Sequence, residues 1–446
     1  MKNKVFYLIS LAVFFTLYFL FNSQDIIASL SRANSDSPFA VMFQYGSAWI
    51  LAITVSAIVY IGLSALGREM GPKRIEMKTE FTVNAPVSKI IKKDPEFNAD
   101  SFLMSVSFLG KKLNTAWTEN RMGPVRNLVS AGLQNRFRIQ LELMKMNGIQ
   151  NIMSEWVMNS VSIAAVETDA SYETVHVEIH AWAKDLNISR KLTPEKRAEM
   201  LLEKAQEDYF EIWSFVRKRG AVTKYGNGIL SGNCPNCGAD IRNLGELNQC
   251  RHCKSVINSG EYGWVLSEIT QKEEWNPNQK AKTAVPDNIF KYNDTVNRQI
   301  IEDRTSYLFW RWMECLAKGT QKPLSRDASD EMLKNFQPSK KYIGDAAVGA
   351  VELLSVSEKT GRYLAKIKIL WSASFSEGAV SQHRRNIFTI TIPMGLRKKS
   401  GLSENSCESC GAPLPETDAL KCSYCGSSLP LIVNDWILEL VEKEKI

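Results

Sequence analysis

The stretch Cys234-Pro-Asn-Cys237, followed after twelve residues by Cys250-Arg-His-Cys253, decides the fold of the chain around it. The pattern occurs a second time near the C-terminus. There, Cys407-Glu-Ser-Cys410 is followed after eleven residues by Cys422-Ser-Tyr-Cys425. Two copies of one four-cysteine spacing predict two copies of one local structure.

Four thiolates in two Cys-x-x-Cys pairs suit a tetrahedral zinc ion, because each pair holds two sulfurs close together and the loop between brings the pairs face to face. Two disulfides in an exported domain, or redox dithiols, are the alternatives; the duplicated spacing favours zinc ribbons over both. A four-cysteine site has no open position for water or substrate, so we expect both ions to be structural. The predicted ligands of two structural zinc ions are Cys234, Cys237, Cys250, Cys253, Cys407, Cys410, Cys422 and Cys425.

The repeat extends beyond the cysteines. Trp264 and Trp436 each stand eleven residues past the last cysteine of their ribbon. Two helical patterns repeat at an interval of 199 residues, with Phe102, Leu109, Leu113 and Trp117 matched by Ile301, Leu308, Trp312 and Leu316. The ribbons lie 407 − 234 = 173 residues apart, so the second copy is shorter by 199 − 173 = 26 residues. A helix that begins at Thr193, with its flanks, accounts for about that length in the first copy.

The expected order is helix, helix, strand, strand, strand, ribbon, strand, occurring twice, which is an α+β arrangement in which a sheet curves around the first helix. The elements expected in the first copy are helices after Asn98 and at Met122 to Met146, strands at Trp156 to Val166 and Tyr172 to Trp182, a helix from Thr193 to about Gln206, and strands at Tyr209 to Val216 and Trp264 to Ile269. The second copy is expected to place strands at Ala346 to Ser355, Tyr363 to Ser374 and Arg385 to Ile392.

Two apolar runs, 5–21 and 48–66, are long enough to span a bilayer at ~1.5 Å per residue. Lysines precede the first run and basic residues follow the second, so the positive-inside rule places both flanks in the cytoplasm. We therefore expect a multi-pass protein of the cell membrane whose C-terminal body is cytoplasmic. A cleaved signal peptide at Met1 to about Ser31 is the alternative for the first run.

These observations divide the chain into five expected parts. They are a membrane segment at 1–69, a juxtamembrane linker at 70–95, a first domain at 96–270 with its ribbon at 234–253, a polar linker at 271–286, and a second, divergent domain at 287–446 with its ribbon at 407–425. The net charge of +7 is modest for 446 residues, and acidic residues are interleaved with basic ones. This argues against a dedicated nucleic-acid-binding protein.

Three other residues deserve separate consideration. His176 and His180 share one face of an expected strand, but residues four apart on a strand lie about 13 Å apart, too far to chelate one ion. We therefore expect structural roles for both. Cys315, the ninth cysteine, lies in an apolar helical pattern and is expected to be a small core residue.

The sequence resembles the Tim-forty-four-like domain family, named for a subunit of the mitochondrial inner-membrane translocase. The resemblance rests on Asn98 to Trp117, on Tyr209 to Arg217, and on Cys234 to Ala239 followed by Ser259 to Ser267, which is similar to the ribbon segment of bacterial members. It implies cone-shaped domains similar to nuclear transport factor two, membrane association, and a pocket for a binding partner such as an acyl chain. It implies no catalytic residues.

Three functions follow as hypotheses. The favoured one is a membrane-tethered binding or scaffold protein, not an enzyme, whose domains bind a protein or lipid partner. The second is an isomerase-like or hydratase-like enzyme with Asp169, Glu178 or His180 at the mouth of a pocket. The third is nucleic-acid binding through basic triplets at Arg217 to Arg219 and Arg397 to Lys399, which the interleaved charge disfavours.

Overall fold

The computed structural model describes residues 84–168, 171–224, 231–244, 247–275, 298–396, 402, 407–412, 414 and 419–444. Contacts divide the chain into two compact units, Met1–Glu80 and Phe81–Ile446, and all described residues belong to the second. The expected membrane spans at 5–21 and 48–66 lie outside the described residues. Within the described ranges, no helix is long and apolar enough to cross a membrane.

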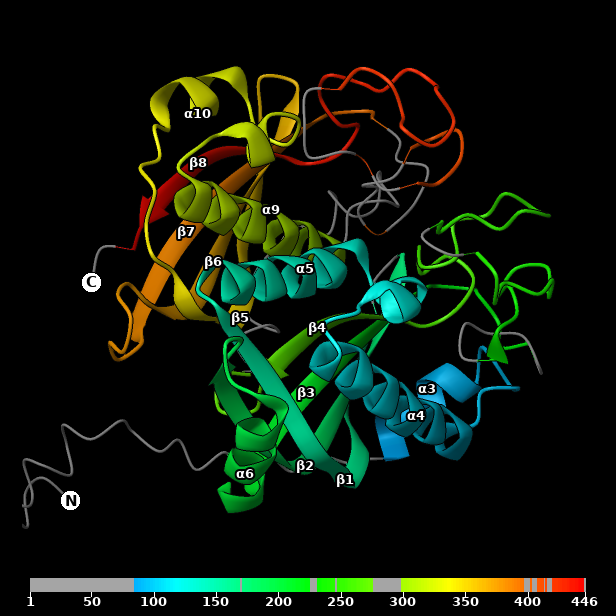
Figure 1. The fold of residues 1–446 in the computed structure, drawn as a ribbon. Helices are drawn as coiled ribbons and strands as arrows, with labels where there is room; N and C mark the ends of the chain where they lie inside the picture. Colours follow the sequence, from blue (N-terminus) through cyan, green and yellow to red (C-terminus); the bar gives the residue numbers. More distant parts are fainter. Residues whose placement is uncertain are drawn as a thin grey trace, which may run out of the picture. The chain divides into compact units, whose positions relative to one another are not determined.

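The first half of this unit is a four-stranded antiparallel sheet with helices packed on it (Figure 1). Its strands follow the chain in the order β1-β2-β3-β4. The elements are α3 (Asn84–Ile91), α4 (Ala99–Thr118), the 3-10 helix η1 (Gly123–Leu128), α5 (Ala131–Met146), β1 (Ile149–Thr168), β2 (Tyr172–Ser189), α6 (Pro194–Glu203), β3 (Glu207–Lys218) and β4 (Val265–Gln271).

From α4 onward, the described residues of the second half repeat the order of elements of the first, except that no helix there corresponds to α6. Its sheet runs β5-β6-β7-β8 and is again antiparallel throughout. The elements are α9 (Arg298–Lys318), η3 (Lys322–Leu324), α10 (Asp330–Asn335), β5 (Gly344–Lys359), β6 (Arg362–Ser374), β7 (Gln382–Pro393) and β8 (Ile437–Lys443). The chain is therefore an α+β protein with two four-stranded sheets.

The internal repeat is visible in matched backbone contacts. Ser130 caps α5 and its N–H donates to Leu266 O at 2.8 Å; 199 residues later, Ser329 caps α10 and its N–H donates to Leu438 O at 2.9 Å. The residue before each serine forms the same parallel bridge to the last strand of its sheet. The interval read from the sequence thus matches equivalent positions in space.

Local sequence explains where the first elements lie. The side chain of Asn98 accepts a hydrogen bond from Ser101 N at 2.8 Å and so starts α4, as expected. Helical spacing buries Val106, Leu109 and Leu113 against the sheet. In β2, the alternation predicted for Val175 through Ala181 directs the apolar side chains into the same core.

Two expectations for the first half need correction. The helix expected at Met122 to Met146 is interrupted, because Val129 adopts an extended conformation and bridges to Leu266 before α5 begins at Ala131. The strands expected at Trp156 to Val166 and Tyr172 to Trp182 are parts of longer strands, β1 and β2, whose polar ends lack the alternation that marks a half-buried strand.

Two segments expected to be linkers contribute to the folded body. Within 70–95, residues 84–91 form α3, and Ile90 and Asp94 are buried. Within 271–286, Gln271 ends β4 and Trp275 is buried against Ala164 and Ile212, while 276–286 lie outside the described residues. These buried residues could not be recognised from the polar composition of their segments, because a single apolar side chain in a charged segment gives no periodic signal.

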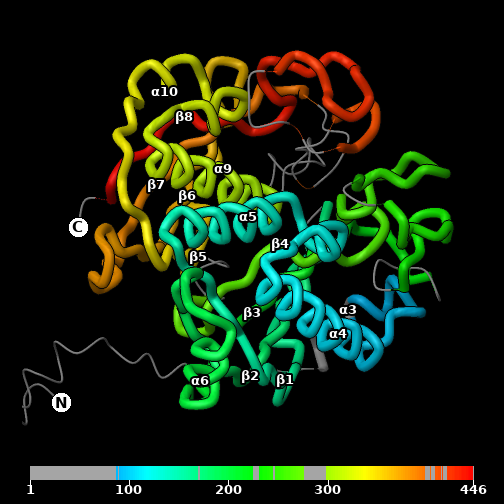
Figure 2. Tube along the Cα trace, viewed as in Figure 1, coloured from blue at the N-terminus to red at the C-terminus, as the bar shows by residue number. Residues whose placement is uncertain are grey.

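The two halves meet along α5 and α9 (Figure 2). Arg138 donates to Glu314 Oε2 at 2.9 Å, and Asn135 Nδ2 donates to Tyr307 O at 3.2 Å. At Gly132 a Cβ atom would lie 2.5 Å from the backbone oxygen of Asp303, so the close approach requires glycine. This contact explains why α9 is buried on nearly its whole circumference.

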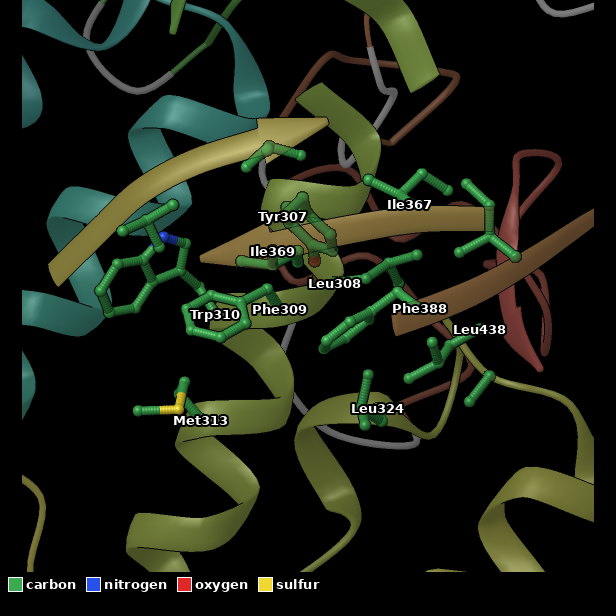
Figure 3. Close-up of a cluster of buried hydrophobic side chains, with 14 of the residues drawn as sticks. Tyr307, Leu308, Phe309, Trp310, Met313, Leu324, Ile367, Ile369, Phe388 and Leu438 are labelled. Atoms are coloured by element: carbon green, nitrogen blue, oxygen red, sulfur yellow. The ribbon is translucent and has the colours of Figure 1, made fainter. Parts of the chain in front are cut away.

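The core of the second half lies between α9 and its sheet. Figure 3 shows Leu308 and Phe309 of α9 close to Ile369 and Phe388 of the strands. The Phe309 and Phe388 rings meet edge to face with centroids 6.0 Å apart. Cys315 is fully buried in this cluster, which confirms the expectation of a core residue.

Candidate metal centres and ligand pocket

Both four-cysteine groups come together as the sequence predicts. In the first ribbon, Cys234 Sγ lies 3.7 Å from Cys253 Sγ, and Cys237 Sγ lies 3.8 Å from Cys250 Sγ. The second ribbon repeats these distances, with 3.7 Å between Cys407 and Cys425 and 3.8 Å between Cys410 and Cys422. Within each group, all four sulfurs lie within 4.8 Å of one another.

These separations fit a tetrahedral metal site. Four sulfurs at about 2.3 Å from a common centre stand about 3.8 Å apart along each tetrahedral edge, whereas a disulfide requires about 2.05 Å. All eight cysteines are free thiols. The two groups are therefore positioned to bind metal, and the donor set and spacing suit zinc.

The knuckles are shaped by glycines that follow a cysteine. Gly238 and Gly411 adopt φ values of +79° and +73°, in the left-handed region that glycine enters without strain. The Gly238 N–H donates to Cys234 O at 2.9 Å, and the Gly411 N–H donates to Cys407 O at 2.8 Å. Each turn directs the two cysteines of its pair toward the same point.

A serine two residues after the last cysteine supports each site. Cys425 Sγ lies 3.0 Å from Ser427 Oγ, and hydrogen bonds from the Ser427 side chain and backbone lower the pKa of that thiol to about 6. Burial raises the pKa of Cys253, but hydrogen bonds from the Ser255 side chain and backbone outweigh it and lower the pKa to about 6. In the same two groups, burial raises the pKa of Cys234 and of Cys410 to about 12, so each serine favours the thiolate only at a cysteine that it contacts.

The two ribbons touch each other. Leu247 of the first ribbon packs into the apolar cluster of the second, beside Cys407, Ala412 and Leu429. The Asn248 N–H donates to Gly411 O at 3.4 Å. The first ribbon is therefore held on one side by the second.

On its other side, the first ribbon borders a pocket of 680 Å³ that opens at the start of α4 and the end of β3. In Figure 1 the green segment that carries this ribbon lies beside α4. Five aromatic side chains contribute to the lining, and they are Phe97, Phe102, Phe215, Tyr262 and Trp264. The Phe102 ring lies 5.3 Å from Phe215 and 5.7 Å from Trp264, so the aromatic groups form one continuous wall.

The opposite walls come from α4 and from the ribbon itself. Ser101 and Ser105 line the pocket from α4, and Pro235, which stands between two cysteines of the first knuckle, lines it from the ribbon. Lys224 also lines the pocket, and its Nζ donates to Asn236 O in the knuckle at 2.9 Å.

Arg217 forms the charged end of this pocket and is itself buried. It donates to Asp94 Oδ2 at 2.6 Å and to Glu173 Oε2 at 3.1 Å, and its guanidinium lies 4.3 Å from the centre of the Trp264 ring. Burial raises the pKa of Asp94, but hydrogen bonds from Arg217 and Thr223 outweigh it and hold that pKa below its usual value. Arg217 is thus a buried ion-pair residue, although the nucleic-acid hypothesis counted it in an accessible basic triplet.

Two donors in the pocket wall lack an acceptor. Among the described side chains, Arg217 Nε and Trp264 Nε1 are buried without a hydrogen-bond partner. A buried donor without an acceptor costs about 1–3 kcal/mol.

The equivalent position in the second half is filled. Arg304, which lies 304 − 105 = 199 residues after Ser105, is fully buried in α9. Its Nε donates to Trp436 O at 2.8 Å, and its guanidinium contacts Asp327 at 2.7 Å. Trp436 directly precedes β8 as Trp264 directly precedes β4, so the repeat position of the pocket-lining Ser105 carries a buried arginine in the second half.

The acid–base candidates named from the sequence are not brought together at this pocket. His176 is buried on the other face of β2, with Nδ1 2.9 Å from Ser214 Oγ. His180 lies 2.8 Å from Asp208 Oδ1 and stacks on Phe210, and Glu178 accepts from Lys272 Nζ at 2.6 Å. Asp169 lies outside the described residues.

One titratable residue on the core-facing side of the first sheet, Glu211, was not among the candidates predicted from the sequence. Glu211 shares that side of β3 with Trp213 and Phe215, and it accepts a hydrogen bond from Trp213 Nε1 at 2.9 Å. Burial raises its pKa, although Trp213 and the charge of Arg136 act in the opposite direction. The signal was available, because Glu211 interrupts an inward-facing alternation of aromatic residues.

Comparisons with known proteins add little. No family model matches the chain, and no curated protein matches it. One solved structure, described as an "Ntf2 like protein involved in plasmid conjugation", is 8% identical to this chain. The alignment covers 74% of this chain and 96% of that one, with a TM-score of 0.17.

Proposed function

We propose that this chain is a membrane-tethered binding protein with two cone-shaped Tim-forty-four-like domains, of which the first binds an apolar group of a lipid or protein partner. The apolar runs at 5–21 and 48–66 support the tether, with the body on the cytoplasmic face. The observation that carries the binding role is the 680 Å³ aromatic pocket of the first half. Its volume falls in the ordinary range of ligand sites, about 300–1,000 Å³.

The difference between the halves supports a division of roles. Ser105 leaves the first pocket open, whereas Arg304 occupies the corresponding space of the second half and is held by Asp327 and Trp436. We assign ligand binding to the first domain and a supporting role to the second, whose helix α9 packs along α5.

Both zinc ions act structurally in this proposal. Four cysteine ligands fill the coordination of each ion, so the metal stabilises its ribbon and takes no part in chemistry. The first ribbon then supplies a pocket wall through Pro235, and the second supports the first through Leu247.

The charges of the pocket argue against the other two hypotheses. Arg217 is committed to Asp94 and Glu173, so it is unavailable to a phosphate backbone. Glu178 and His180 lie on the opposite face of the sheet with partners of their own. An aromatic lining with few polar groups suits a pocket that binds a ligand and does not catalyse a reaction.

Photo-crosslinking in native membranes tests the proposal. The photoreactive residue p-benzoylphenylalanine is introduced at Tyr262 in the pocket wall, and at Val380, which is 86% exposed in the turn between β6 and β7, as a control. We expect a light-dependent adduct at position 262 that is absent at 380, and its mass distinguishes a lipid from a protein partner. Equal labelling at both positions, or none at 262, would overturn the assignment.

A further inference from the structure

We infer that metal occupancy of the first ribbon controls the affinity of the pocket, so that zinc and ligand bind cooperatively. The inference rests on the proposed ligand-binding role of the pocket. It concerns the first ribbon alone, because the second ribbon contributes no residue to the pocket lining.

The first step of the argument is the shared residue. Pro235 lies between the metal-binding Cys234 and Asn236 in the knuckle, is buried, and lines the pocket. A Cβ atom at Gly263 would lie 3.4 Å from Pro235 Cβ, which places the knuckle against the backbone that leads into Trp264. The position of this wall therefore follows the conformation of the knuckle.

A second connection runs through polar groups. Lys224 lines the pocket and donates to Asn236 O at 2.9 Å, while Asn236 Nδ2 donates to Ser255 Oγ at 2.7 Å in the second knuckle of the same ribbon. Asn236 Nδ2 also lies 3.7 Å from Cys253 Sγ. The metal site and the pocket rim thus share one hydrogen-bonded chain.

The third step is the small core of the ribbon. Besides its cysteines, the buried apolar cluster of the first ribbon contains Ile241, Leu244 and Ile257. A core of this size does not hold a fold of two knuckles by itself, so metal binding supplies the folding free energy. Loss of the ion would release Pro235 and open the pocket wall to water.

Coupling of this kind is reciprocal. If zinc raises the affinity for a pocket ligand by some factor, the ligand raises the affinity for zinc by the same factor. A ligand should therefore slow the loss of one ion and leave the other unaffected.

The experiment uses the full chain in detergent and 1-anilinonaphthalene-8-sulfonate, an aromatic probe whose rings match the aromatic wall formed by Phe102, Phe215 and Trp264. One variant removes the first site (Cys237→Ser with Cys253→Ser), and a matched variant removes the second (Cys410→Ser with Cys425→Ser). Zinc content is measured on both, and each is expected to retain one ion.

We expect the first-site variant to bind the probe at least about tenfold more weakly, within the usual range of coupling between sites, and the second-site variant to stay within about threefold of the wild type. Equal probe affinity in the two variants would overturn the coupling while leaving the binding role intact. A wild type that does not bind the probe, or binds it no better than Ser105→Arg, would overturn both.

Zinc release from the wild type provides a test that does not depend on a variant folding. A chromogenic chelator such as 4-(2-pyridylazo)resorcinol is added with and without saturating probe. We expect the probe to slow release of one of the two ions by about tenfold, and this protection to vanish in Ser105→Arg. Identical release with and without probe, in a wild type that binds it, would contradict the inference.

Discussion

Ser105 in α4 and Arg304 in α9 occupy the same position of the repeat, 199 residues apart, yet Ser105 lines an open pocket and Arg304 is fully buried against Trp436. In the first half this position lines a pocket, and in the second half it carries a buried arginine.

This relationship predicts the effect of Ser105→Arg. The larger side chain should enter the pocket as Arg304 does in the second half, and overfilling costs about 1–3 kcal/mol, or roughly five- to hundredfold in affinity. Probe titration by fluorescence measures the loss. Thr115→Arg, at an exposed position of the same helix, should leave affinity unchanged. A Ser105→Arg protein with wild-type affinity would show that the ligand binds elsewhere.

Replacing Arg217 by methionine should destabilise the protein. Asp94 and Glu173 would remain buried without their counter-charge, which costs about 3–5 kcal/mol for a buried pair. Chemical denaturation measures the free energy of unfolding. The neighbouring Arg219→Met, at an exposed residue, should change it by less than about 0.5 kcal/mol. Similar stabilities of the two variants would contradict the buried ion pair.

The same ion pair predicts a pH dependence. Because the pKa of Asp94 is lowered in the folded state, its contribution is present above its unfolded pKa and is lost as pH falls through the folded value. The destabilisation caused by Arg217→Met should therefore shrink under acidic conditions. Chemical denaturation at a series of pH values tests this. If the difference in unfolding free energy between the wild type and Arg217→Met grew toward low pH, the prediction would be contradicted.

Glu211→Gln should stabilise the protein at neutral pH, whereas Arg217→Met should destabilise it. The pKa of Glu211 is raised in the folded state, so the folded protein binds more protons than the unfolded chain, and this carboxyl weakens the fold as pH rises through the folded pKa. The amide variant, which carries no charge, should raise the melting temperature at neutral pH and lose that advantage at acidic pH. A stabilisation independent of pH would point to packing instead.

Gly411 and Gly426 form a matched pair for testing the contact between the ribbons. Both adopt left-handed φ values, +73° and +72°. A Cβ at Gly411 would lie 2.6 Å from Gln249 Cβ of the first ribbon, whereas nothing lies within 4 Å of a Cβ at Gly426. Alanine at either site costs about 1 kcal/mol from the backbone, and Gly411→Ala should cost about 1–3 kcal/mol more from the clash. Chelator-driven zinc release compares them, and equal rates would argue that the ribbons do not touch.

Much of the metal site and of the repeat could be predicted from the sequence, because cysteine spacing and helical periodicity are local signals. Cys234 and Cys407 start equivalent knuckles, and Asn98 caps its helix as expected. The two four-cysteine groups could be predicted without any knowledge of tertiary contacts.

The pocket could not be predicted in the same way, because it depends on residues that meet only in the folded chain. Arg217 belongs to a basic triplet that resembles a solvated strand end, and its partner Asp94 lies 123 residues earlier in a segment with linker-like composition. Glu211 gave a detectable signal as a charged residue in an inward alternation, whereas the Ser105–Arg304 difference required the structure of both halves.

Native mass spectrometry of the full chain and of Ser105→Arg, purified side by side in detergent without chelator, tests the central claim most directly. We predict two zinc ions on each protein, together with a bound ligand or partner mass on the wild type that Ser105→Arg lacks. Fewer than two zinc ions on the wild type, or the same bound species on both proteins, would contradict a zinc-supported pocket in the first domain.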